Sequence, residues 1–105
     1  MKCISVDDLH NRVQNLGPRD LILDVRTPEE FQAAHIHGAQ NTPHEKVIGI
    51  ADNLKQYQTI YVHCKMGGRA KIAAQALREA GLDNIVCVGD GGMERWIEMG
   101  WALEK

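Results

Sequence analysis

The chain has 105 residues, of which 44% are hydrophobic, 12 are basic and 14 are acidic, and its formal net charge at pH 7 is −2. This length allows one domain with one hydrophobic core, so we expect a single domain over residues 1–105. The charges are mixed without a basic run, and no apolar stretch approaches the roughly 18 residues of a membrane span, which predicts a soluble cytoplasmic protein that binds neither nucleic acid nor membranes. We expect it to be a monomer, although no sequence feature specifies the oligomeric state.

The first third of the chain alternates short apolar runs with helical patterns. A strand stub at residues 3–4 precedes a helix that Ser5 is expected to cap and Gly17-Pro18 to end. Leu21–Val25 is nearly all apolar, which is typical of a strand that is covered on both faces.

A capping box opens the next predicted helix. Thr27 is the expected N-cap, Pro28 occupies the first helical position and Glu30 the third, and the helix is expected to run through Ala34. Ile36–Asn41 then predicts a turn into a short strand.

The rest of the chain continues this alternation. Strands are predicted at Thr59–His63 and Ile85–Val88, and helices at Pro43–Leu54, Ala70–Ala80 and Met93–Met99. Strands and helices that alternate in this way predict an open, mostly parallel α/β sheet with right-handed crossovers. Ligands of such sheets bind beyond the carboxyl ends of the strands.

The loop after the strand at 59–63 carries the strongest functional signal. It begins with Cys64 and contains Gly67 and Gly68, which can adopt positive φ angles, so that backbone N–H groups can surround the sulfur. The positive end of the following helix and the cations Lys65 and Arg69 also favour thiolate over thiol. We therefore expect Cys64 to be a nucleophile rather than a buried, inert cysteine.

The other two cysteines give no sign of a disulfide framework. Cys3, Cys64 and Cys87 are odd in number and contain no C-x-x-C pair, which fits a reducing compartment. We interpret Cys87 as a core residue and Cys3 as a packing residue near the terminus, with a resolving-cysteine role as the alternative.

Three histidines are weaker candidates. His63 adjoins Cys64, but neighbours on a strand point to opposite faces, which favours a packed or capping histidine over a catalytic base. His35 and His37 form an H-x-H pair without companion ligands, so no metal site is expected.

Four further residues have a structural and a functional interpretation. Asp24 and Arg26 follow a strand and predict an ion pair or turn, or else part of an active-site rim. Trp96 is expected to be a core anchor rather than a substrate-stacking residue, and Met93 a gap-filler rather than a pocket residue.

Three blocks of the sequence follow one another in the order of a known signature. They are Leu23–Arg26 with Glu30-Phe31 and His35–Asn41, then Cys64–Arg69, then Gly91–Met93 with Trp96. On these blocks the chain resembles a single-domain rhodanese, a sulfurtransferase, over almost its whole length. Ala34 stands where the family usually has glycine, and Ala70 where it usually has serine.

The resemblance implies a five-stranded parallel sheet with helices on both faces, and a persulfide on Cys64. The implied enzyme is a thiosulfate sulfurtransferase, which moves a sulfane sulfur from thiosulfate or a similar donor to cyanide, a thiol or a protein acceptor. Thiolate attack on sulfur needs no general base. The expected substrate-binding residues form the loop: Lys65, Met66, Gly67, Gly68 and Arg69. Their backbone would hold the persulfide, the cations Lys65 and Arg69 would attract the anion, and no cofactor or metal is expected.

Two rival functions remain open at this point. His63-Cys64 and Arg69 resemble the H-C-x5-R loop of cysteine phosphatases and arsenate reductases, but only four residues separate this cysteine from the arginine, which favours a cradle too small for a tetrahedral oxyanion. The other rival is a non-enzymatic regulatory module or a sulfur carrier that serves one protein partner.

Overall fold

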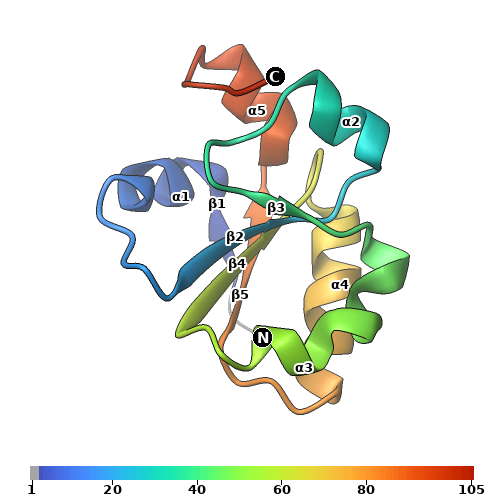
Figure 1. Cartoon of the computed structure of the whole chain (residues 1–105). Helices are drawn as coiled ribbons and strands as arrows, with labels where there is room; N and C mark the ends of the chain where they lie inside the picture. Colours follow the sequence, from blue (N-terminus) through green and yellow to red (C-terminus); the bar gives the residue numbers. More distant parts are fainter. Residues whose placement is uncertain (1–2) are drawn as a thin grey trace.

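The computed structural model describes residues 3–105 and contains one five-stranded parallel sheet with the strand order β1-β5-β4-β2-β3 (Figure 1). The strands are β1 (Cys3–Ser5), β2 (Asp20–Asp24), β3 (Gln40–Asn41), β4 (Thr59–His63) and β5 (Ile85–Asp90). The helices are α1 (Val6–Val13), α2 (Pro28–Ala33), α3 (Ala51–Leu54), α4 (Gly68–Glu79) and α5 (Gly92–Glu98), and a 3-10 helix, η1 (His44–Ile50), precedes α3. The predicted α/β sheet is thereby confirmed. Within the described range, no helix has both the length and the apolarity needed to cross a bilayer.

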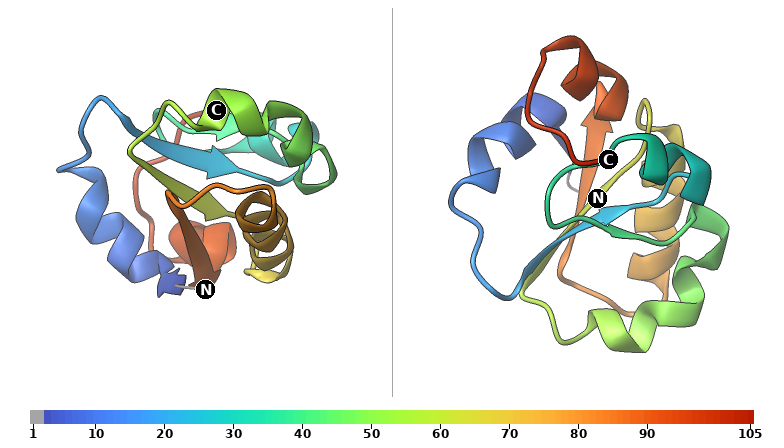
Figure 2. Two further views of the ribbon diagram at one scale, coloured as in Figure 1. Left: turned by 90° about the horizontal axis from the view of Figure 1, so that it is seen from below. Right: turned by 45° about the horizontal axis from the view of Figure 1, so that its top comes forward.

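Helices cover both faces of the sheet (Figure 2). On one face α4 packs through four small or apolar side chains, Ala70, Ala73, Ala74 and Leu77, together with η1 and α3. On the other face α1 and α5 pack against each other and the sheet. The side chains of β4 alternate between these cores, with Ile60 and Val62 in the first and Tyr61 in the second.

Two predicted helix starts have the expected caps. The side chain of Ser5 accepts a hydrogen bond of 3.1 Å from the backbone N–H of Asp8 and so begins α1. At α2, Thr27 accepts from the N–H of Glu30 at 3.2 Å while the Glu30 carboxylate accepts from the N–H of Thr27 at 3.0 Å. The capping box therefore fixes the backbone and one carboxylate oxygen of Glu30.

Other boundaries differ from the prediction. Helix α1 ends at Val13, because the chain already turns before Gly17, whose N–H donates to the Asp20 side chain at 2.9 Å. The expected helix at 43–54 is instead the 3-10 helix η1 followed by the single turn of α3, and the N–H of His44 at its start donates to the carbonyl of Val25, the residue after β2. Strand β5 runs on to Asp90, since Ser5 of β1 pairs with that residue.

The C-terminal residues return to the body of the domain. The indole N–H of Trp96, which is 2% exposed, donates to the carbonyl of Ala102 at 2.9 Å. Further on, Glu104 and His35 exchange two backbone hydrogen bonds in an isolated antiparallel bridge. Trp96 is thus a core anchor, as its sequence interpretation expected, and it holds the segment that follows α5.

Leu77→Ala is expected to lower the free energy of unfolding by about 2–5 kcal/mol, because Leu77 is fully buried in the core under α4. The matched control is Ile72→Ala on the same helix, where the side chain is 61% exposed and the change is expected to stay within about 0.5 kcal/mol. Chemical denaturation measures both. Equal losses in the two variants would contradict the assignment of the buried face.

Candidate functional site

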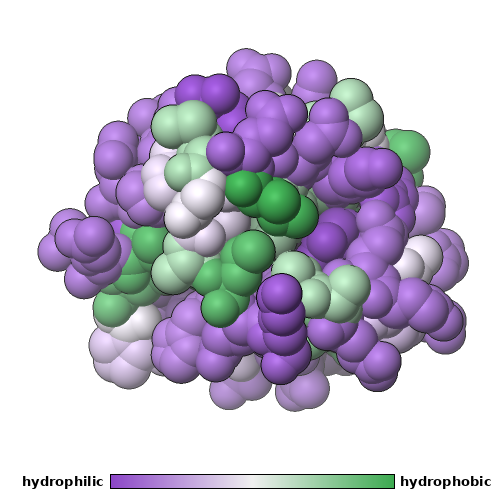
Figure 3. Space-filling view, turned by 90° about the horizontal axis from the view of Figure 1, so that it is seen from above, coloured by the Kyte–Doolittle hydropathy of each residue, from purple (hydrophilic) through white to green (hydrophobic). Residues whose placement is uncertain are grey.

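The loop that joins β4 to α4 lies at the carboxyl edge of the sheet, where parallel-sheet proteins bind ligands (Figure 1). Figure 3 views the molecule from above this edge and shows hydrophobic and hydrophilic residues next to each other around a hollowed surface. Cys64 directly follows the last residue of β4 and is only 1% exposed. Its sulfur is therefore reached through the loop and not from an open surface.

Two backbone N–H groups point at the Cys64 sulfur. The N–H of Gly67 donates to Sγ at 3.1 Å, and the N–H of Ala70, in the first turn of α4, donates at 3.2 Å. Hydrogen bonds from backbone amides and the positive end of a twelve-residue helix both favour negative charge on the acceptor. The arrangement can hold a thiolate, or the inner sulfur of a persulfide, without any charged side chain in contact with it.

Only one of the two loop glycines has the unusual backbone angle. Gly67 has φ +124°, whereas Gly68 has no positive φ and forms the first residue of α4. A Cβ at Gly67 would overlap the backbone carbonyl of Gly89 in β5, while a Cβ at Gly68 would meet nothing within 4 Å. The close approach of the loop to β5 therefore requires glycine at 67 and not at 68.

Helix α5 holds the loop from the other side. The N–H groups of Met93 and Glu94 donate to the carbonyls of Cys64 at 2.9 Å and of Lys65 at 3.0 Å. The contact is so close that a Cβ on Gly92, which has φ +48°, would lie 2.5 Å from both carbonyl oxygens. The start of α5, which belongs to the third sequence block, thus binds the backbone of the Cys64–Arg69 loop.

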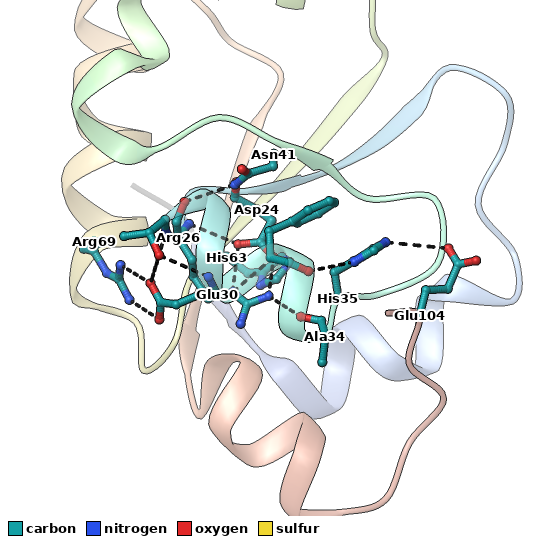
Figure 4. Close-up of polar contacts among 11 residues, drawn as sticks. Asp24, Arg26, Glu30, Ala34, His35, Asn41, His63, Arg69 and Glu104 are labelled. Carbon is teal, nitrogen blue, oxygen red and sulfur yellow. Dashed lines mark hydrogen bonds and ion pairs between the residues drawn. The ribbon is translucent and has the colours of Figure 1, made fainter.

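Arg69 is held by an acidic partner. Its guanidinium donates to the two carboxylate oxygens of Glu30 at 2.8 and 3.1 Å, and both side chains are more than two-thirds buried (Figure 4). The hydrogen bond from Arg69 is the largest cause that lowers the pKa of Glu30 to about 2, and the same bond raises the pKa of Arg69. The charge of Arg69, expected to attract an anion, is therefore balanced within the protein.

Asp24 and Arg26 form a buried ion pair. Asp24 is fully buried, Arg26 is 5% exposed, and the guanidinium of Arg26 contacts both Asp24 oxygens at 2.8–3.1 Å. Arg26 also donates to the carbonyl of Ala34 at 2.7 Å, and the amide of Asn41 donates to the carbonyls of Asp24 and Arg26 (Figure 4). The first sequence block therefore ties β2, α2 and β3 together at the carboxyl edge. The C-cap of α2, Ala34, has an extended backbone with φ −169°, so no glycine is needed there.

His63 is packed beneath this ion pair. It is fully buried, and among the described residues neither of its ring nitrogens has a hydrogen-bond partner. Burial lowers its pKa, so the ring is neutral near pH 7, although Nε2 lies 3.9 Å from an Asp24 oxygen. In the pleat of β4 it shares the side of Tyr61, opposite to that of Cys64. This geometry agrees with the sequence-based prediction that His63 is a packed side chain and not a catalytic base.

The H-x-H pair is linked to the C-terminal segment. His35 stacks on Phe31 with ring centroids 3.9 Å apart, and both His35 and His37 approach the Glu104 carboxylate, at 3.8 and 3.0 Å. The hydrogen bond from His37 is the main cause that lowers the pKa of Glu104. Within residues 3–105, neither this group nor any other group of three or more His, Cys, Asp or Glu side chains is arranged so that it could hold a metal ion.

Cys3 and Cys87 lie opposite each other on neighbouring strands. They are register partners in the β1–β5 ladder, Cys87 is fully buried, and Cys3 is exposed. Burial is the main cause that raises the pKa of Cys87 to about 12. Both cysteines are reduced, and Cys87 belongs to the core under α4, as its apolar strand suggested.

A hollow of about 260 Å³ opens beside the loop. It is lined by seven residues from the first block, the loop and α5: Arg26, Glu30, Lys65, Met93, Glu94, Ile97 and Glu98. Met93, 1% exposed, forms part of its apolar wall, a pocket position that the sequence interpretation had ranked second. The sequence patterns did not single out Glu94, Ile97 or Glu98, because their approach to Lys65 depends on how α5 packs on the loop.

Gly67→Ala is expected to destabilise the fold by at least about 1–2 kcal/mol, because an L-residue is strained at this positive φ and the added Cβ overlaps Gly89. Gly68→Ala is the matched control and is expected to be neutral or slightly stabilising, since its Cβ has free space and alanine favours helix. Denaturant unfolding of both variants checks this. The assigned loop geometry would be contradicted if Gly68→Ala cost as much as Gly67→Ala.

Glu30→Gln is expected to remove a pH-dependent part of the stability. The pKa of Glu30 falls from 4.5 to about 2 on folding, so its carboxylate stabilises the fold fully above about pH 4.5 and loses this effect as the pH falls towards 2. The parent is therefore expected to exceed Glu30→Gln by about 1 kcal/mol near pH 6, a modest value because water screens this partly exposed pair. The difference is expected to shrink between pH 5 and pH 3.

Unfolding titrations at several pH values measure that difference, with Glu79→Gln as the control. Glu79 is exposed and accepts one hydrogen bond from Gln75. A Glu30→Gln difference that stayed constant from pH 6 to pH 3 would contradict the depressed pKa.

Comparison with known proteins gives a consistent family. The model of the rhodanese-like domain matches residues 5–99. A Bacillus subtilis protein named "Putative sulfur carrier protein YrkF" is 36% identical over 75 residues, which are 71% of this chain and 40% of that protein. The adenylyltransferase and sulfurtransferase UBA4 of Candida albicans is 31% identical over 101 residues, which cover 89% of this chain and 23% of that protein.

A solved structure extends the likeness to the whole fold. The crystal structure of a rhodanese-related protein from Thermoplasma volcanium superimposes with a TM-score of 0.83 and 30% identity, covering 99% of this chain and 98% of that one. By contrast, the chain spans at most 59% of the length of the first curated relatives. From the match of the family model over residues 5–99 and this shared fold, the chain belongs to the rhodanese-like domain family.

Proposed function

We propose that the protein is a sulfurtransferase that carries a sulfane sulfur as a persulfide on Cys64. The observation that carries the proposal is the pair of hydrogen bonds that Sγ of Cys64 accepts from the N–H groups of Gly67 and Ala70. These donors stabilise the attacking thiolate and, later, the same sulfur as a leaving group. The membership of the rhodanese-like family and the sulfurtransferase named among the relatives support the same chemistry.

Loading is a displacement at sulfur. The Cys64 thiolate attacks the outer sulfur of a donor such as thiosulfate, an S–S bond forms, and the S–S bond of the donor breaks with sulfite as the leaving group. The product is a persulfide anion on Cys64, and the total charge is unchanged. No proton moves in this step, so it needs no base, which agrees with a fully buried and neutral His63.

Discharge reverses the roles of the sulfurs. A thiolate or cyanide attacks the outer sulfur of the persulfide, the S–S bond on Cys64 breaks, and the Cys64 thiolate is released onto the N–H groups of Gly67 and Ala70. The backbone from Lys65 to Arg69 would surround the transferred sulfur, with Met66 at the outer rim of the loop. Lys65 supplies the cation nearest in sequence to Cys64, whereas Arg69 orders the loop through Glu30.

A cysteine phosphatase fits this loop less well. In the transition state of phosphoryl transfer, the three equatorial oxygens need hydrogen-bond donors and a cation that balances their negative charge. Here four residues separate Cys64 from Arg69, and the guanidinium of Arg69 is bound in a bidentate manner to Glu30. These two features favour a single sulfur atom over a tetrahedral oxyanion as the cargo of the loop.

Cys64→Ser is expected to abolish sulfur transfer while the fold stays intact, because serine keeps the size of the side chain and removes the thiolate. Thiosulfate:cyanide turnover should fall by about a thousandfold or more. Intact-mass analysis after thiosulfate should show one added sulfur atom on the parent, lost on cyanide, and none on Cys64→Ser. The control is Cys3→Ser at an exposed position, which should load as the parent does. Retained turnover in Cys64→Ser would overturn the proposal.

A further inference from the structure

The charges at the mouth of the Cys64 loop do not form the cationic site that a small dianion would favour. Of the charged residues that line the hollow, Arg26 is paired with Asp24 and Glu30 with Arg69. Among residues 3–105, no ion pair joins the remaining three, Lys65, Glu94 and Glu98, to another side chain. One cation and two anions are therefore left to face an incoming reactant, with a local formal charge of −1.

Both acidic side chains border two adjoining hollows. Glu94 and Glu98 lie on the exposed side of α5 and line the 260 Å³ hollow beside Lys65 as well as a second one, of about 270 Å³, beside Met66 and Arg95. Arg95 is itself bound to Asp7 in a bidentate pair. Two acidic residues are thus common to both hollows, and the other charged residue of the second hollow, Arg95, is already paired.

Exposed apolar side chains surround the same carboxylates. Ile97 on α5, which is 48% exposed, lines the first hollow together with the buried Met93, and Met66 in the loop, which is 63% exposed, lines the second. The first hollow, of about 260 Å³, is open to solvent and extends along α5 from Met93 to Glu98, so a reactant larger than a small ion can enter it. Burying this apolar surface would stabilise a larger reactant that carries apolar groups of its own.

We propose that the physiological sulfur acceptor of Cys64 is a cysteine on a polypeptide segment with basic and apolar residues beside that cysteine, docked on Glu94, Glu98, Ile97 and Met66. This proposal rests on the proposed sulfur transfer and names its acceptor. The basic residues complement the two unpaired carboxylates, and the apolar residues cover Ile97 and Met66. Charge complementarity of this kind raises association rates and selects partners.

The transfer itself is redox-neutral. The acceptor thiolate attacks the outer sulfur of the Cys64 persulfide, a new S–S bond forms on the acceptor, and the bond to Cys64 breaks with its electron pair going to Sγ. The released thiolate returns to the N–H groups of Gly67 and Ala70. Glu94 and Glu98 take no part in this exchange and act only on the approach of the acceptor.

The test compares three thiols as acceptors from protein that has been loaded on Cys64 and freed of excess donor. The probes are a peptide with cysteine between lysines and leucines, a peptide with glutamates in place of the lysines, and N-acetylcysteine amide. Transfer is followed by mass analysis at low ionic strength and again in high salt. The lysine peptide is expected to react about tenfold faster than the glutamate peptide at low salt, and high salt is expected to remove most of this difference.

Two double variants change the net charge by the same amount, one at the proposed docking surface and the other far from it. Glu94→Gln with Glu98→Gln removes the proposed docking charges, and is expected to reduce the preference to about threefold or less and to raise kcat/KM for thiosulfate. Glu79→Gln with Asp83→Asn is the control. Glu79 ends α4, which spans about 18 Å from the loop, and Asp83 lies in the turn before β5, so the preference should be unchanged.

Each outcome has a distinct meaning. Equal rates for the two peptides in the parent, or an unchanged preference in the Glu94→Gln, Glu98→Gln variant, would overturn the docking surface. Faster reaction with N-acetylcysteine amide than with the lysine peptide would overturn it in favour of a small free thiol. If none of the tested donors added sulfur to Cys64, the sulfurtransferase proposal on which the inference rests would be overturned instead.

Discussion

The two backbone N–H groups that donate to the Cys64 sulfur are the constraint on which the rest of this site depends. Amides can converge on one atom only if the chain curls tightly, and here that curl requires the positive φ of Gly67 and its contact with the backbone of β5. The first turn of α5 then fixes the loop carbonyls of Cys64 and Lys65. Backbone donors held in this way need no reorganisation when charge develops on the sulfur.

The charged side chains around the loop have mainly structural partners. Arg69 is bound to Glu30, whose backbone and carboxylate also form the capping box of α2, so the loop is tied to a helix 39 residues earlier in the chain. Arg26 is bound to Asp24 and to the carbonyl of Ala34. Removing one partner of such a pair would leave the other charge uncompensated. The two arginines are held by carboxylates, whereas Lys65, Glu94 and Glu98, which have no ion-pair partner among residues 3–105, line the hollow beside the loop.

This division assigns different tasks to different layers of the site. In the proposed sulfur transfer, the backbone of the loop would support the chemistry at sulfur, which is common to any donor or acceptor. The rim formed by Lys65, Met66 and the exposed side of α5 would then distinguish one reactant from another. Because α5 packs through Met93 and Trp96 and leaves Glu94, Ile97 and Glu98 exposed, the rim can change without disturbing the loop.

Elements with local signals can be predicted from the amino-acid sequence alone. Apolar runs gave β2, β4 and β5, Ser5 and Thr27 gave the starts of two helices, and strand–helix alternation gave the parallel sheet. The position of Cys64 at a strand end, before two glycines and a helix, pointed to an anion-holding loop for the same reason. Each of these signals acts within a few residues, so no knowledge of packing was needed.

Contacts between distant segments of the chain depend instead on how the helices and strands pack. The pairing of Arg69 with Glu30, the approach of β5 that makes Gly67 rather than Gly68 indispensable, and the acidic rim from α5 all join segments far apart in the sequence. In the sequence, Arg69 and Lys65 are equally plausible as cations that attract an anion. In the fold, Arg69 is paired with the carboxylate of Glu30, whereas Lys65 is not. Local patterns carry no information about such contacts, because the partner is chosen by how helices and strands pack and not by spacing along the chain.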